Sequence, residues 1–105
     1  MTEKDQIKQK VYDAIDHYAD SLVQTAKDIG NNPESGFKEY KTAKKVEDWL
    51  QSFNLEYESN VAMTGIKAVV QGRAGDGPTI AVIGELDSMV VPDHVIEDPI
   101  THAAH

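Results

Sequence analysis

The sequence contains no cysteine, one tryptophan and no long apolar run. Without cysteine, the chain can form neither a disulfide scaffold nor a cysteine-ligated metal site, and it has no cysteine nucleophile. No apolar stretch approaches the roughly 18 residues that a membrane-spanning helix requires. The start of the chain is charged and is not followed by an apolar region, so we expect no secretory signal and a cytoplasmic protein.

Basic residues are also scarce, above all after residue 50. Eighteen acidic residues against ten basic ones give a net charge of −8, and residues 51–105 hold eight of the acids but only Lys67 and Arg73 as bases. Because such a surface repels phosphate groups, nucleic acid is not an expected partner, and without an apolar span neither is a membrane. Acids together with histidines suit divalent cations, and they equally suit a solvated surface.

The remaining composition is that of one small globular domain. Hydrophobic residues make up 40% of the 105 residues and charged residues 27%, which is typical of a folded protein. A chain of this size buries roughly two-thirds of the surface that its unfolded form exposes, so we expect a thin core.

The first half of the sequence predicts two amphipathic helices. Apolar residues recur at three- and four-residue steps through residues 4–29, and the run from Gly30 to Pro33 ends this helix. We expect its apolar stripe to pack on the protein's own sheet rather than in a coiled coil. A second helix is predicted over residues 39–53. Its expected buried stripe consists of Ala43, Val46, Trp49, Leu50 and Phe53.

After Asn54 the pattern becomes that of strands. A weak extended segment leads into a β-prone run at 65–71, and residues 79–84 are apolar on both faces, as in a strand covered on both sides. The glycines between the two runs favour a turn over a phosphate loop, because no helix follows them. This turn predicts that the two strands are antiparallel neighbours. The expected fold class is α/β, with two helices packed on a small mixed sheet.

The acidic pair Glu85 and Asp87 directly follows the second predicted strand. Alternation along a strand sends both side chains to one side, at the carboxyl end where open α/β sheets bind ligands. Two acids there could bind a metal, orient a histidine ligand, or act as acid and base. The alternative is a solvated strand end.

Three histidines near the end of the chain are a second candidate site: His94, His102 and His105. His102 and His105 would share one face of a helical turn. Two histidines make a weak metal site, because a structural or catalytic metal requires at least three protein ligands. A small metal-binding domain that combines them with Glu85 and Asp87 is therefore one hypothesis, and an end without function is the other.

The order of three motifs resembles a known family. They are Asn32-Pro33-Glu34-Ser35-Gly36-Phe37, then Thr64-Gly65-Ile66, then Gly84-Glu85-Leu86-Asp87-Ser88. This order is similar to the N-terminal segment of the metal-dependent aminoacylase and carboxypeptidase-type amidohydrolases. It is most similar to the branch that contains hippurate hydrolase, auxin-conjugate amidohydrolases and aminobenzoyl-glutamate hydrolase. The resemblance covers nearly the whole chain from about Ile7 onward.

The resemblance implies a zinc-peptidase-like catalytic domain that holds zinc or manganese and hydrolyses amide bonds of N-acyl amino acids or small peptides. In the wider family a His-x-Asp stands at this strand end, and Asp87 matches the aspartate that steadies the metal-binding histidine. Glu85 stands where that histidine would be. The branch resembled here also has an acid at this position and takes ligands from a later His-x-Cys-Gly-His stretch. His105 matches the first histidine of that stretch, which is not usually counted as a ligand.

The resemblance further implies that the metal ligands, the glutamate that takes a proton from metal-bound water and the lid domain lie C-terminal to His105. We therefore expect residues 1–105 to be the N-terminal part of a catalytic domain that ends before its metal site. Asp87 and Glu85 are the candidate catalytic residues, no bound metal is expected in this chain, and the isolated chain is expected to be inactive. The alternative is an acidic stand-alone interaction module. Its incomplete sheet would lead to self-association.

Overall fold

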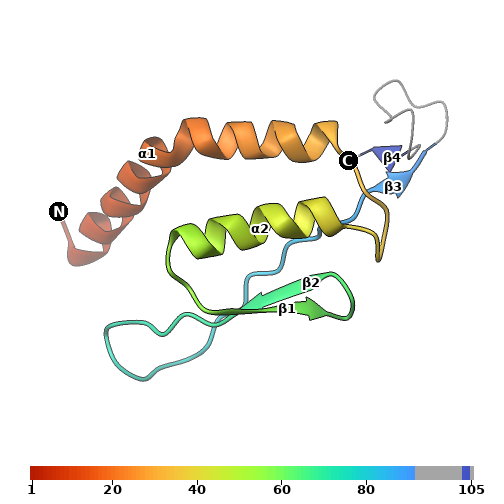
Figure 1. The fold of residues 1–105 in the computed structure, drawn as a ribbon. Helices are drawn as coiled ribbons and strands as arrows, with labels where there is room; N and C mark the ends of the chain where they lie inside the picture. Colours follow the sequence, from red (N-terminus) through yellow and green to blue (C-terminus); the bar gives the residue numbers. More distant parts are fainter. Residues whose placement is uncertain (92–102, 105) are drawn as a thin grey trace.

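The computed structural model describes residues 1–91 and 103–104. Their elements, in chain order, are α1 (Glu3–Asn31), α2 (Tyr40–Ser52), β1 (Tyr57–Val61), β2 (Gly65–Ala68), β3 (Met89–Val90) and β4 (Ala103–Ala104). Strand β1 pairs with β2 and β3 pairs with β4, both antiparallel (Figure 1). Two helices with a small sheet agree with the expected α/β class, but the paired strands described form no mixed sheet.

Both helices form where the apolar period predicts them. At the start of α1, the Thr2 hydroxyl accepts a hydrogen bond from the Asp5 N–H (3.2 Å) and the Asp5 carboxylate accepts one from the Thr2 N–H (3.1 Å). At its end, the Asn32 N–H donates to the Ile29 carbonyl (3.1 Å). These bonds satisfy terminal groups that have no partner inside the helix. None of the helices in the described part of the chain is long and apolar enough to cross a bilayer.

Helix α1 packs against α2 rather than on the sheet, so the expectation that it covers the sheet was wrong. The ring of Tyr18 meets the rings of Trp49 and Phe53 edge-on, with centroids 6.2 and 5.5 Å apart. The two helices run antiparallel, and only the second half of α1 lies along α2 (Figure 1). Helix α2 itself packs on β2, and it therefore separates α1 from the β1–β2 hairpin.

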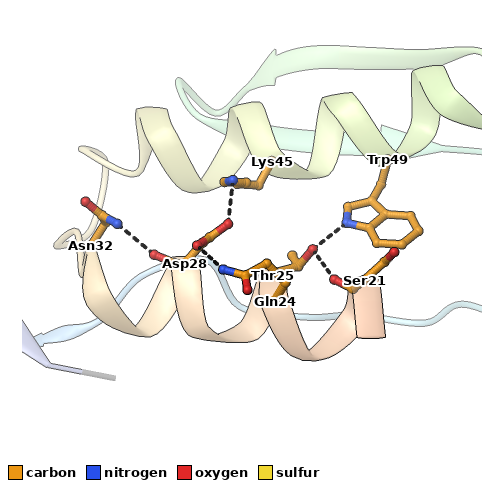
Figure 2. A network of polar contacts seen from close by, with 7 residues as sticks. All are labelled: Ser21, Gln24, Thr25, Asp28, Asn32, Lys45 and Trp49. Atoms are coloured by element: carbon orange, nitrogen blue, oxygen red, sulfur yellow. Dashed lines mark hydrogen bonds and ion pairs between the residues drawn. The ribbon is translucent and has the colours of Figure 1, made fainter. Parts of the chain in front are cut away.

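Polar contacts extend the interface between the helices toward the end of α1 (Figure 2). The Trp49 indole N–H donates to the Thr25 hydroxyl (3.0 Å), and the Lys45 ammonium lies 3.0 Å from the Asp28 carboxylate. The hydrogen bond from Lys45, together with one from the Gln24 amide, holds the pKa of Asp28 below its ordinary value. On α2 the contacting residues Lys45, Trp49 and Phe53 are four positions apart, so they share one face of the helix.

The β1–β2 hairpin has a turn that requires unusual backbone angles. Asn60, Ala62 and Met63 all have positive φ, at 57°, 48° and 82°. At Gly65 a side chain is excluded, because a Cβ there would lie 2.6 Å from the Val61 carbonyl oxygen. The β-prone run predicted over 65–71 is thus confirmed in its first four residues.

Residues 79–84 do not form the buried strand that their apolar sequence predicts. The segment is irregular, and Ile80, Val82 and Ile83 are 85%, 96% and 88% exposed. The predicted pairing with 65–71 was also wrong, because β2 pairs with β1. A strand apolar on both faces needs neighbours at its edges and cover on each face, and the described residues supply neither. The turn between the two runs is present, with Gly75 at φ 102°.

The arrangement of α1 on α2 leads to a stability prediction for Tyr18. Replacing Tyr18 by alanine removes the two edge-on ring contacts with α2, which should lower the free energy of unfolding by about 1–3 kcal/mol. Urea unfolding followed through the fluorescence of Trp49 measures this change. Tyr12→Ala is the matched control, because Tyr12 lies on the same helix and is 56% exposed. Equal losses in the two variants would contradict the packing described here.

Candidate functional site

Glu34, in the loop between the helices, caps the start of α2. Its carboxylate accepts hydrogen bonds from the backbone N–H groups of Lys41 (3.0 Å) and Thr42 (2.7 Å) and from the Thr42 hydroxyl (2.8 Å). The first N–H groups of a helix have no partner within it, and the helix dipole favours negative charge at this end. The Glu34 side chain thus anchors the loop to α2.

The backbone of Glu34 binds a second, distant segment. Both the N–H and the hydroxyl of Ser88 donate to the Glu34 carbonyl oxygen, each at 2.8 Å. Ser35 and Ser88 also form a parallel backbone bridge, and Ser88 is buried. Two stretches of chain that are 54 residues apart in sequence are therefore held side by side.

Glu39, the residue just before α2, joins the same loop to the hairpin. One carboxylate oxygen accepts a hydrogen bond from the Phe37 N–H (2.8 Å), and the other accepts one from the Thr64 hydroxyl. Burial raises the pKa of Glu39, but these hydrogen bonds outweigh it and bring the pKa below its ordinary value. Glu39 is therefore a buried carboxylate stabilised in its ionised form.

Gly36 lies between two carboxylates. A Cβ added to Gly36 would lie 3.9 Å from a Glu39 oxygen and 4.0 Å from an Asp87 oxygen. Asp87 is exposed, so it forms the solvent side of this cluster, while Glu39 forms its buried side. The structure thus places Asp87 beside the Asn-Pro-Glu loop.

The other acid singled out from the sequence is Glu85, for which no contact with this cluster is seen among the described residues. Glu85 is exposed in the irregular segment, so the strand alternation that was expected to bring it to one side with Asp87 is absent. Within residues 1–91 and 103–104, no three acidic or histidine side chains come together in a group that could hold a metal ion. His94, His102 and His105 lie outside the described residues. The described residues therefore do not form a metal centre.

The sequence analysis did not predict that four polar side chains are buried. They are Glu39, Thr42, Thr64 and Ser88. Glu34 stands in the first motif and Glu39 directly precedes α2, but the sequence does not reveal which groups they bind. The local signal for a helix cap is an acid at the start of a helix. That signal points to Glu39, whose side chain makes no cap bond, and not to Glu34, whose side chain does. The partners Thr64 and Ser88 come from distant positions and carry no such signal.

Comparison with known proteins places this chain among relatives of much greater length. It is 32% identical to the N-acetylcysteine deacetylase of Bacillus subtilis over 73 residues, which is 69% of this chain and 19% of the relative. It is 28% identical to a thermostable carboxypeptidase of Saccharolobus solfataricus over 81% of this chain, and 30% identical to an IAA-amino acid hydrolase of Arabidopsis thaliana over 74%. No family model and no solved structure matches.

These similarities support a relationship to amidohydrolases and peptidases and do not single out one branch. The chain spans about a fifth of the length of the curated relatives that it matches.

Glu39 gives the cluster a testable acid sensitivity. A carboxylate whose folded pKa is lowered stabilises the fold above its unfolded pKa, and this contribution is lost as pH falls through the folded value. We expect the free energy of unfolding to decrease as pH drops below the ordinary value of 4.5. In Glu39→Gln, stability at neutral pH should be lower and this decrease should be smaller.

Urea unfolding between pH 3 and pH 7 measures the effect. Glu56→Gln is the control. Glu56 is exposed, so the free energy of unfolding of this variant should vary with pH as it does in the wild type. A Glu39→Gln protein that loses stability with acid as steeply as the wild type would contradict the assignment.

Proposed function

We propose that this chain is the N-terminal part of a metal-dependent hydrolase that cleaves amide bonds in N-acyl amino acids or small peptides. The order of the three motifs supports the proposal, as does the similarity to a deacetylase, carboxypeptidases and amino acid-conjugate hydrolases. Zinc or manganese is the proposed metal of the whole protein, and the cytoplasm is its proposed compartment.

The single observation that carries this proposal is the double hydrogen bond from Ser88 to Glu34. It joins the first motif to the third, although 54 residues separate them. Motifs scattered along a sequence can serve one site only if the fold brings them together. Here the bond fixes the residue next to Asp87 against a loop that is itself held on α2.

We propose that Asp87 orients a metal ligand of the whole protein. Glu85 is a second acid of the same stretch, to which we assign no separate role. Asp87 is anchored through its neighbour Ser88 and faces the glycine of the first motif, so its carboxylate is held in one region. Since the described residues form no metal centre, the proposed ligands come from elsewhere in the whole protein.

The first consequence of this proposal is that the 105-residue chain alone is inactive. Purified chain, incubated with N-acetyl amino acids and added Zn²⁺ or Mn²⁺, should release no amino acid faster than buffer with the same metal. Detection of free amine by a fluorogenic reagent gives the rate. Turnover above the buffer rate would show that the chain carries a complete catalytic site.

A chimera tests the proposed function itself. This chain would replace the matching fifth of the Bacillus subtilis N-acetylcysteine deacetylase, and we expect the chimera to retain deacetylation of N-acetylcysteine. In the chimera, Asp87→Asn should lower kcat/KM about 10–100-fold, the usual effect of removing a residue that orients a metal ligand.

Asp76→Asn is the matched control, because Asp76 is an exposed acid in the turn before the apolar segment. It should leave kcat/KM within about twofold. A chimera that folds, as judged by circular dichroism, but does not deacetylate would overturn the proposed function. Equal losses in Asp87→Asn and Asp76→Asn would overturn the role of Asp87 alone.

A further inference from the structure

The loop between the helices makes a tight turn with an unusual residue order. The Lys38 N–H donates to the Ser35 carbonyl (3.0 Å) and closes the turn, and the third residue of the turn, Phe37, has a φ of 61°. A positive φ at this position favours glycine or asparagine, because a bulky side chain clashes with the backbone there. The glycine of the turn, Gly36, stands one position earlier, and its φ is not positive. Backbone preference therefore does not explain the order of Gly36 and Phe37.

Gly36 instead leaves space between two carboxylates. A Cβ added to Gly36 would be in ordinary contact with both Glu39 (3.9 Å) and Asp87 (4.0 Å), so a longer side chain would have a carboxylate on either side. Asp87 thus lies against the backbone of the turn, with no side chain of Gly36 in between. A shift of the turn therefore changes the surroundings of Asp87 directly.

Glu39 holds the turn in its unfavourable conformation. Its carboxylate accepts a hydrogen bond from the Phe37 N–H (2.8 Å) at one oxygen and from the Thr64 hydroxyl at the other. Glu39 is 6% exposed, and among the described residues no lysine or arginine forms an ion pair with it. One of the hydrogen bonds that stabilise its charge thus binds the residue with the strained backbone. Such strain persists only where the surrounding structure fixes it, and strained residues gather at functional sites.

The segment that contains Asp87 is attached to the same turn. Glu34, directly before the turn, accepts both hydrogen bonds of Ser88 at its carbonyl oxygen, while its side chain is anchored on the first N–H groups of α2. The hairpin holds the other end of the turn through Thr64 and Glu39. The position of Asp87 therefore depends on a loop that is held at both ends.

We propose that Glu39 is a positioning residue for Asp87. Held by Thr64, the Glu39 carboxylate fixes the turn and, through the turn, the place of the Asp87 carboxylate. The consequence for catalysis rests on the proposed function, whereas the mechanical link from Thr64 to the segment at Asp87 can be tested without any activity. A carboxylate that only stabilised the fold would affect all parts of the molecule alike. A positioning residue affects the segment at Asp87 first, because local openings occur without global unfolding.

Hydrogen exchange of the Ser88 backbone amide, followed by NMR in the full chain, tests the mechanical link. Thr64→Val removes the hydroxyl and keeps the shape of the side chain, so Ser88 should exchange at least about tenfold faster. The Trp49 amide in α2 should change by less than about twofold, because the opening is local. Thr64→Ser keeps the hydroxyl and should restore the wild-type rate. Thr79→Val is the matched control, because Thr79 is exposed.

Glu39→Gln is a second variant for the same measurement. An amide has one acceptor oxygen in place of two, so it cannot serve Phe37 and Thr64 in the same geometry, and Ser88 should again exchange faster. An unchanged Ser88 rate in Thr64→Val and Glu39→Gln would overturn the inference. Equal acceleration at Ser88 and Trp49 would also overturn it, because it would show a general loss of stability.

The chimera with the Bacillus subtilis deacetylase tests the consequence for catalysis. Thr64→Val should lower kcat about tenfold and leave KM within about twofold, because a misplaced Asp87 affects the reacting groups more than substrate binding. Thr64→Ser should recover kcat. In a chimera that already carries Asp87→Asn, Thr64→Val should add almost no further loss, since residues that act through one group are not additive.

These outcomes separate the positioning role from the proposed function. A folded chimera that does not deacetylate would overturn the proposed function, and the exchange rates of Ser88 would then decide the role of Glu39. An active chimera in which Thr64→Val keeps full kcat would overturn the positioning role. Losses from Thr64→Val and Asp87→Asn that multiply would overturn it as well.

Discussion

Glu34 holds together several segments of the described part of this protein. Its carboxylate caps α2 and its carbonyl oxygen accepts both hydrogen bonds of Ser88. One residue therefore ties the α1–α2 loop, the start of α2 and the approach to β3 to each other. Because charge-assisted bonds at a helix N-terminus combine hydrogen bonding with the helix dipole, this is a strong place to anchor a loop.

Glu39 and Thr64 complete this polar centre. The apolar side chain of Ala43 is buried at 8% exposure, and the polar side chains of Glu39 and Thr42 are buried further, at 6% and 3%. Burying polar groups costs free energy unless each finds a partner, and here the partners come from the loop, the helix and the hairpin. The consequence is a fold centred on hydrogen bonds, with most of its apolar residues still at the surface.

The exposed apolar residues and the motif cluster lie in different parts of the molecule. The cluster at Glu34, Glu39 and Asp87 carries the proposed link to amide hydrolysis, whereas the apolar side chains of segment 79–84 are exposed. This segment leads directly into Glu85 and Asp87.

Local patterns in the sequence determined the two helices. The apolar period predicted α1 and α2, and the Gly30–Pro33 run ended α1. These features depend on residues a few positions apart, so the sequence contains what is needed to predict them. The β1–β2 turn was not predicted, because its positive φ angles fall on Asn60, Ala62 and Met63 rather than on glycine. The resemblance singled out the motif stretches around Glu34 and Asp87, but it did not predict that they lie side by side.

Only the tertiary structure decided which distant groups are partners. The bonds of Ser88 to Glu34 and of Thr64 to Glu39 join residues 54 and 25 positions apart, and no period reveals such a pairing. The same reason explains why the buried strand predicted over 79–84 was wrong. The apolar sequence indicates that the segment should be covered, but it does not indicate which element covers it. Burial depends on the surfaces that other elements bring, and these are set by the whole fold.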